Sequence, residues 1–240
     1  MERLDALEAA QRIVAARFPD ATAAFLTGSA LTRRQTSTSD LDIVIVIQGP
    51  PAPFRETTRE HGWPVELFVQ TPASIQYFSD LEAANQSAVT LQMISDGFIL
   101  LSVDGEAERI QSSANKRLKE GPQPLSEVEM RRRRYLLTDQ LDDLIGATDP
   151  NEILFITQQL LVGCSELALL SKKQWLSSGK WLPRTLAIND FDLSDRLYAA
   201  AKSVIVDEDK TLMEAVVRKI LGRVGGPLTE GYKVEGEILG

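Results

Sequence analysis

The sequence predicts an α+β protein in which a small mixed β-sheet flanked by helices is followed by an all-helical bundle. Short apolar runs of strand length alternate with helical patterns up to about residue 120. Beyond that point the apolar residues recur almost entirely at helical spacing. The two patterns meet at Gly121-Pro-Gln-Pro124, a segment typical of a linker. We therefore expect two domains, residues 1–120 and 121–240.

The first half alternates between helix and strand. Residues 3–18 are charged and amphipathic, which predicts a helix. Short apolar runs bounded by Gly, Pro and polar residues are typical of buried strands. The elements expected after this helix are strands at 22–27 and 41–48, a turn at 49–53, a strand at 64–70, helical segments from about 72 to 96, a strand at 98–102 and a helix at about 105–119.

The second half shows helical patterns. Residues 127–145 carry an apolar stripe, and Asp149-Pro150 opens a long apolar helix that runs to about residue 174. Further helices are expected at 191–206 and 208–222. Such stripes are far more often the core of a bundle than a cofactor site.

Composition excludes several classes of function. A formal net charge of -8 and a pI near 4.9 disfavour an extended nucleic-acid surface, although a small nucleotide stays compatible. The one cysteine, Cys164, lies in an apolar run and is expected to be a buried hydrophobe in a reducing cytoplasm. No signal sequence is evident, and no stretch reaches the roughly 18 to 20 apolar residues needed to span a bilayer, so we expect a cytoplasmic protein without a membrane partner.

Two aspartates open the strand expected at 41–48. Asp40 and Asp42 are two residues apart, so their side chains project from the same face of the strand. Two carboxylates that close together repel each other unless something positive lies between them. Mg²⁺ commonly binds one or two carboxylates together with substrate phosphates and water. The pair therefore predicts a divalent-metal site.

Gly28, Ser29 and Glu66 are the other candidates in this half. The glycine follows an expected strand and lets the backbone approach a phosphate closely, while the serine hydroxyl and the following amides are donors. Glu66 lies in an apolar strand, where an ionised side chain is costly unless it is paired or binds a metal. The other interpretation is ordinary: a turn before a strand, an edge-strand charge and a solvated glutamate.

The spacing of Gly28-Ser29, Asp40, Asp42 and the later strand acid Glu66 resembles the motif of the nucleotidyltransferase superfamily. More narrowly, the layout is similar to that of bacterial aminoglycoside adenylyltransferases, in which a minimal nucleotidyltransferase domain precedes a helical domain. The chain departs from many relatives in having no glycine between residues 30 and 39.

This resemblance implies transfer of a nucleoside monophosphate, expected to be AMP from ATP, to a hydroxyl acceptor with release of pyrophosphate. Two Mg²⁺ ions are implied, with Asp40 and Asp42 on the first and Glu66 sharing the second or acting as general base. Gly28 and Ser29 would hold the terminal phosphates. The expected partners are a nucleoside triphosphate and an unidentified acceptor, expected to be a small molecule. Two alternatives stay open: an antitoxin-like protein adenylyltransferase, and a nucleotide-binding regulatory module without turnover.

A further candidate lies in the segment 178–184, where Gly179 and Pro183 predict a turn rather than a helix. In two-domain nucleotidyltransferases the helical domain packs over the catalytic cleft. The resemblance therefore implies that Lys180 or Arg184 contacts the triphosphate. A solvated cationic loop is the equally weighted alternative.

Other charged residues carry weaker expectations. The run Arg131–Arg134 could bind phosphate, but consecutive helical residues point all round a helix, which favours a solvated face. Asp139, Asp142 and Asp143 could receive a cationic acceptor such as an aminoglycoside, or pair with those arginines. The one histidine, His61, is expected to lie exposed in a loop, so a Ser-His-Asp or zinc site is not predicted.

Overall fold

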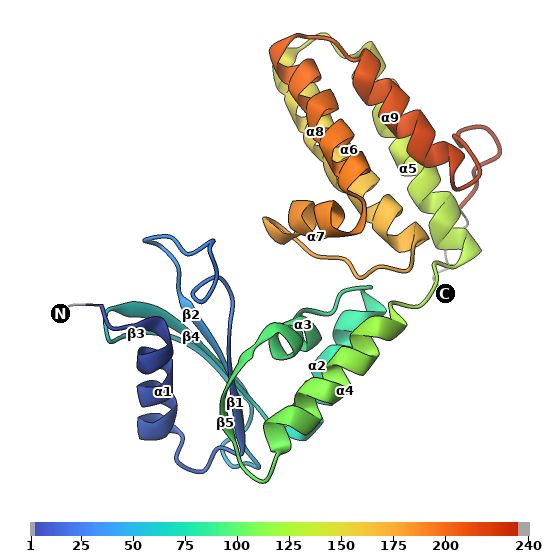
Figure 1. The fold of residues 1–240 in the computed structure, drawn as a ribbon. Helices are drawn as coiled ribbons and strands as arrows, with labels where there is room; N and C mark the ends of the chain where they lie inside the picture. Colours follow the sequence, from blue (N-terminus) through green and yellow to red (C-terminus); the bar gives the residue numbers. More distant parts are fainter. Residues whose placement is uncertain (1–2, 235–240) are drawn as a thin grey trace, which may run out of the picture. The chain divides into compact units, whose positions relative to one another are not determined.

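The computed structural model describes residues 3–234. The chain divides into two compact units, Met1–Gly121 and Pro122–Gly240. Figure 1 shows a sheet with helices in the first unit and helices in the second. Over the described residues the chain forms five strands, all in the N-terminal unit, and nine helices. The predicted fold class, a small mixed sheet flanked by helices and followed by a helical bundle, is confirmed.

The sheet has the strand order β3-β4-β2-β1-β5. β2 and β4 are parallel, whereas the other neighbouring pairs are antiparallel. Four strands agree with the predicted ones to within two residues at either end. The apolar runs of β1, β2 and β4 are buried in the sheet, whereas β5 is partly exposed at the edge of the sheet. The strands are β1 (Ala23–Thr27), β2 (Leu41–Val46), β3 (Phe54–Glu60), β4 (Trp63–Gln70) and β5 (Phe98–Ser102).

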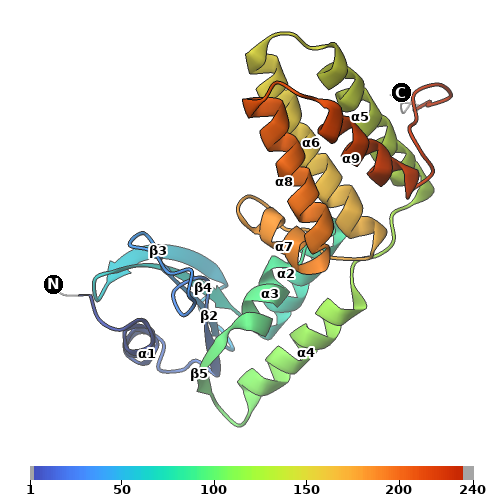
Figure 2. The same ribbon diagram turned by 45° about the horizontal axis from the view of Figure 1, so that its top comes forward.

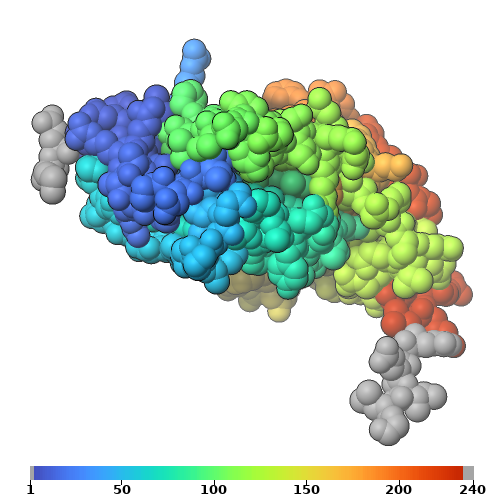
Figure 3. All heavy atoms as spheres, turned by 90° about the horizontal axis from the view of Figure 1, so that it is seen from below, coloured from blue at the N-terminus to red at the C-terminus, as the bar shows by residue number. Residues whose placement is uncertain are grey.

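Helices cover the two faces of the sheet at different places. α1 (Ala6–Arg17) buries its apolar stripe against the face formed by the leucine, isoleucine and valine side chains of β2 and β4. α3 (Val89–Asp96) and α4 (Glu106–Glu120), with α2 (Pro72–Ala84) packed on α3, lie on the other side near β1 and β5 (Figures 1 and 2). Parts of α1 and α4 also form the surface of this unit, coloured blue and green in Figure 3.

β3 was not among the predicted elements. Only its first residue, Phe54, is apolar, and its burial alternates along the strand, as expected at the edge of a sheet. The turn His61-Gly62 joins it to β4, with φ angles of 49° and 83°. Two positive φ angles with glycine second are typical of a tight type I′ hairpin, and this pair was the overlooked signal. His61 is half-buried in the turn, not exposed as expected.

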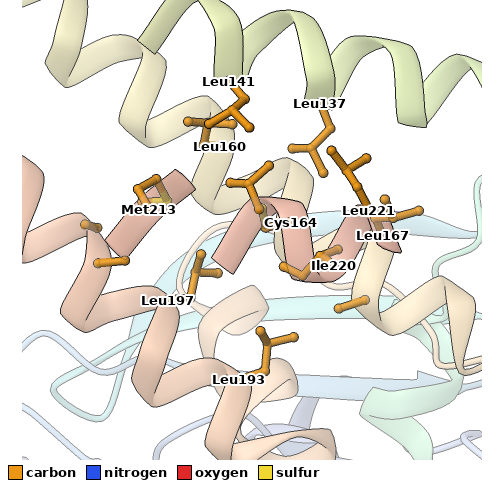
Figure 4. Close-up of a cluster of buried hydrophobic side chains, with 14 of the residues drawn as sticks. Leu137, Leu141, Leu160, Cys164, Leu167, Leu193, Leu197, Met213, Ile220 and Leu221 are labelled. Atoms are coloured by element: carbon orange, nitrogen blue, oxygen red, sulfur yellow. The ribbon is translucent and has the colours of Figure 1, made fainter. Parts of the chain in front are cut away.

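Buried apolar side chains of residues 122–234 form one hydrophobic core. Figure 4 shows Leu137 and Leu141 of α5 directed toward Leu160 and Cys164 of α6, with side chains of α8 and α9 completing the cluster. Burial raises the pKa of the Cys164 thiol to about 12, which agrees with its expected role as a buried hydrophobe. The helices are α5 (Glu127–Gly146), α6 (Pro150–Ser171), α7 (Trp181–Asn189), α8 (Phe191–Val206) and α9 (Thr211–Gly222).

The segment expected to be a loop at 178–184 is in part helical. α7 begins at Trp181, so Arg184 lies in its first turn and Lys180 precedes it. Pro183 does not prevent the helix, because residues of the first turn have no intrahelical acceptor for their N–H groups. The prediction of a turn throughout was therefore wrong beyond Lys180.

Among the described helices, one is long and apolar enough to cross a membrane, judged by length and composition alone. This helix is α6, in which an 18-residue window has a mean hydropathy of 1.7. The expectation that no such stretch exists was wrong by this measure. Core helices of globular proteins have the same composition, and Leu160, Cys164 and Leu167 of α6 are buried in the helical core.

We predict that Leu160→Ala destabilises the helical unit by about 2–5 kcal/mol, because it leaves a cavity at a side chain that is 0% exposed. Leu154→Ala on the same helix is the matched control, since Leu154 is 50% exposed and should cost less than about 0.5 kcal/mol. Urea unfolding followed by far-UV circular dichroism measures both. Equal destabilisation by the two variants would contradict the packing of α6.

Candidate metal centre

Asp42 and Glu66 lie opposite each other on the two parallel strands. The register of β2 and β4 pairs Asp42 with Glu66 and Ile43 with Leu67. Because side chains alternate along a strand, the acids project from one face and the apolar residues from the other. Ile43 and Leu67 are fully buried with α1, and both acids are half-buried. A slip of one residue would bury the acids in the core, so the core fixes their pairing.

Asp40 completes the group from the residue just before β2. One carboxylate oxygen from each of Asp40, Asp42 and Glu66 lies within 4.8 Å of the others. All three residues are half-buried. We call this group the acidic cluster. The structure thus brings together the three acids that the sequence singled out.

Gly28 lies beside Asp42 at the end of β1. The last residue of that strand, Thr27, is paired with Asp42. Gly28 has a φ of 82°, in the left-handed region that favours glycine. A Cβ atom at this position would overlap Asp42 Oδ2. The missing side chain therefore lets the backbone lie directly against a carboxylate of the acidic cluster.

Residues 28–40 form the loop from β1 to β2. Ser29 Oγ lies 2.9 Å from Ser39 Oγ, which also accepts a hydrogen bond from the Thr36 N–H at 2.9 Å. Ser39 is 5% exposed, so these contacts hold the base of the loop. The Ser29 hydroxyl, which the sequence assigns to phosphate, is thus tied to the residue before Asp40.

Arg3 supports the same loop from the N-terminal segment. Its Nη2 donates to the Ser39 carbonyl at 2.6 Å, and its guanidinium lies 3.3 Å from the centroid of the Trp63 ring. Trp63 is buried and donates its indole N–H to the Leu4 carbonyl at 2.8 Å. The backbone just before Asp40 is therefore anchored. Sequence analysis missed Arg3, because its partners are distant in the chain.

Glu66 is paired with a residue of β3. Arg55 Nη2 lies 2.6 Å from Glu66 Oε2, and the Arg55 side chain is 62% exposed. The same guanidinium lies 4.8 Å from the centroid of the Phe68 ring. Because β3 was not predicted, Arg55 was missed as a residue of this site. The His61-Gly62 turn, which predicts a hairpin before β4, is the signal that could have placed it.

The acidic cluster fits a divalent cation. Carboxylate oxygens are the hard ligands that divalent cations such as Mg²⁺ prefer, and Gly28 adds no side chain against the Asp42 carboxylate. Three carboxylates whose oxygens lie within 4.8 Å repel one another unless a cation is present. Asp40, Asp42 and Glu66 could therefore hold a divalent cation, and their side-chain geometry is compatible with the predicted metal site.

Lys180 and Arg184 lie in the helical unit. Lys180 is exposed just before α7, and the Arg184 guanidinium lies 4.6 Å from the centroid of the Trp181 ring. Arg184 Nη1 is buried and has no hydrogen-bond partner among the described residues. A contact of either residue with a triphosphate stays a prediction.

The arginine run of α5 is held by partners within the helical unit: Arg131 and Arg134 donate to backbone carbonyls of residues 225–231. Arg133 Nη1 lies 2.8 Å from Glu166 Oε2. Glu129 pairs with both Arg132 and Arg133, and the hydrogen bond from Arg132 holds the pKa of the Glu129 carboxyl below its usual range. Arg132 and Arg133 therefore pair with glutamates rather than with the aspartates of the same helix.

A groove of about 320 Å³ lies between α5 and α6. Its lining includes Gln140, Gln158 and Glu166. The one carboxylate in that lining, Glu166, is already paired with Arg133. The groove therefore does not offer a donor set comparable with the acidic cluster.

We predict that Gly28→Ala weakens divalent-metal binding, because the new Cβ must displace the Asp42 carboxylate. It should also destabilise the N-terminal unit by about 1–3 kcal/mol through backbone strain. Gly105→Ala is the matched control: φ is 74° there, but the nearest atom to a Cβ is Arg109 Nη1 at 3.6 Å. Binding of Mn²⁺, followed by electron paramagnetic resonance, and thermal unfolding separate the two effects. Loss of metal binding in both variants, or in neither, contradicts the role of Gly28.

Comparisons with known proteins give a distant structural likeness. The chain matches no family model and no curated protein. One similar solved structure is a nucleotidyltransferase-like protein from Exiguobacterium sibiricum, with a TM-score of 0.46 and 12% identity. The match covers 91% of this chain and 74% of that chain. We transfer no residue role from it.

Proposed function

We propose that this protein is a metal-dependent nucleotidyltransferase that moves a nucleoside monophosphate, AMP from ATP, to a hydroxyl acceptor and releases pyrophosphate. The observation that carries the proposal is the acidic cluster of Asp40, Asp42 and Glu66, whose oxygens lie within 4.8 Å of one another. A glycine turn and a loop rich in hydroxyl groups lie directly beside it. Carboxylates for metal and small donors for phosphate are the two requirements of this chemistry.

Each group has a distinct proposed role in binding. Mg²⁺ at the cluster would stabilise negative charge on the triphosphate and lower the pKa of the acceptor hydroxyl. Asp40 and Asp42 would hold the ion that orients the triphosphate, and Glu66 would share a second ion. The Ser29 hydroxyl and the amides after Gly28 would donate to the terminal phosphates, where charge builds as pyrophosphate leaves.

Transfer is an in-line displacement at the α-phosphorus. The acceptor oxygen forms a bond to this phosphorus while the bond to the oxygen that bridges to the β-phosphorus breaks. Pyrophosphate leaves with the electron pair, and Glu66 takes the proton of the acceptor hydroxyl. Glu66 suits this role because it lies on β4, and β2 stands between β4 and β1. The base would thus be separated from the glycine turn at the end of β1, where the terminal phosphates would bind. The acceptor would then enter from the β4 side, away from the terminal phosphates.

The proposed acceptor is a small molecule with positive charge, such as an aminoglycoside. A formal net charge of -8 favours a cationic acceptor over an anionic one. Antitoxins that adenylylate a protein partner are usually little more than the catalytic domain, whereas this chain has a second, helical unit of similar length. We propose that the helical unit supplies part of the acceptor or nucleotide contacts through Lys180 and Arg184.

We predict that Asp42→Asn abolishes turnover and removes the Mg²⁺ dependence of ATP binding, while the fold stays intact, because the amide keeps the shape but loses the charge. Calorimetry with and without Mg²⁺ measures the binding, and pyrophosphate release from ATP with a panel of aminoglycosides measures the turnover. Asp20→Asn, an exposed aspartate of the same unit, is the control and should behave like the parent.

Two results would count against the proposal. ATP affinity that is equal with and without Mg²⁺ in the parent, together with activity in Asp42→Asn, excludes metal-dependent transfer. Metal-dependent ATP binding without pyrophosphate release for any small-molecule or protein acceptor supports the regulatory module instead.

We predict that Lys180→Ala or Arg184→Ala weakens ATP binding about tenfold or more, because a charge-assisted contact to phosphate contributes roughly 1.5–3 kcal/mol. Lys202→Ala, which removes an exposed lysine of α8, is the matched control and should have no effect. If all three variants bind ATP like the parent, the cation at the triphosphate must be sought at Arg33 or Arg34.

A further inference from the structure

The pairing of Glu66 with Arg55 gives the acidic cluster a cation of the protein's own. Arg55 Nη2 lies 2.6 Å from Glu66 Oε2, and a carboxylate oxygen of Glu66 lies within 4.8 Å of those of Asp40 and Asp42. The guanidinium therefore neutralises one of the three carboxylates that would bind a metal ion. It comes from β3, the strand at the edge of the sheet beside β4.

A divalent ion and this guanidinium cannot both lie close to Glu66 without cost. If the ion takes Oε2, the hydrogen bond from Arg55 must break. If it takes the other oxygen, two positive groups share one carboxylate at a separation of a few ångströms and repel each other. In either geometry the ion pair opposes binding of the metal.

The structure also shows why Arg55 can give way. Its side chain is 62% exposed, whereas that of Glu66 is 24% exposed. Exposed ion pairs contribute little to stability, since water solvates both partners when they separate. The Phe68 ring, whose centroid lies 4.8 Å from the guanidinium carbon, offers a surface on which the side chain can stay after release.

We propose that Arg55 is the counter-ion of the acidic cluster, which competes with the divalent cation for Glu66 and thereby sets the metal affinity of the site. This inference rests on the metal site of the proposed function. In the absence of metal, the ion pair with Arg55 holds the Glu66 side chain in place. Binding of the cation would release Arg55. The cost of breaking the ion pair would offset part of the free energy of metal binding.

The chain provides a closely matched control at Arg59. Thr57 is the residue opposite Glu66, and Arg55 and Arg59 each stand two positions from it along β3. Both arginines are exposed and project from the same face of the strand. Arg59 makes no ion pair with Glu66 in the part of the chain that the structure describes. Removal of Arg59 therefore reports the general effect of losing one positive charge nearby.

The test is a titration with Mn²⁺ alone, without nucleotide, in which electron paramagnetic resonance measures the unbound ion. Arg55→Ala and Arg55→Gln should bind Mn²⁺ about two- to fivefold more tightly than the parent, as expected for release of an exposed ion pair. Arg59→Ala should have a clearly smaller effect. In a Glu66→Gln background, Arg55→Ala should tighten binding no more than Arg59→Ala does.

Arg55→Gln keeps the stem of the side chain over Phe68, so it tests the proposal even if the alanine variant is less stable. Unchanged Mn²⁺ affinity in both Arg55 variants overturns the proposal. Weaker binding overturns it too, since Arg55 would then position Glu66 as a ligand rather than compete for it. These results leave the metal site standing. By contrast, a parent protein that shows no Mn²⁺ binding sensitive to Asp42→Asn overturns the metal site and the role of Arg55 together.

Discussion

The parallel pairing of β2 with β4 is the constraint on which the proposed chemistry depends. It places Asp42 opposite Glu66 on one face of the sheet because it places Ile43 opposite Leu67 on the other. The apolar face is buried against α1, so a shift in register would expose the core and bury the acids. Hydrophobic packing thus holds two like charges side by side, a position that neither would take by itself.

Other residues of the N-terminal unit accommodate the acidic cluster. Gly28 lets the backbone pass against Asp42 where any side chain would collide, and the Ser29–Ser39 contact closes the base of the loop. Arg3 fixes the backbone before Asp40, and Arg55 offsets the charge of Glu66. Gly28, the two serines and Arg3 thus organise the site before a ligand arrives, which reduces the entropy lost on binding. The Arg55 ion pair acts in the opposite direction, because a cation that binds Glu66 must compete with it.

Much of this could be predicted from the sequence, because the informative signals are local. The apolar run after Asp40 identified β2, and the glycine before Ser29 identified the turn. The sequence did not reveal β3, since an edge strand with one solvated face needs few apolar residues and resembles a loop. Arg55 lies on β3, so it was not predicted as a residue of the site either. Arg3 was missed for a different reason, because its role depends on contacts with residues far along the chain. At α7, the first-turn position of Pro183 misled the prediction.

The most direct test of the central claim is to locate the metal. Crystals of the parent protein grown with Mn²⁺ and a non-hydrolysable ATP analogue should show an anomalous scattering peak bounded by Asp40, Asp42 and Glu66, with metal–oxygen distances of about 2 Å. The phosphates of the analogue should lie on the Gly28–Ser29 side of the ion. A peak at another site, or bound analogue without an ion at these three carboxylates, would contradict the account.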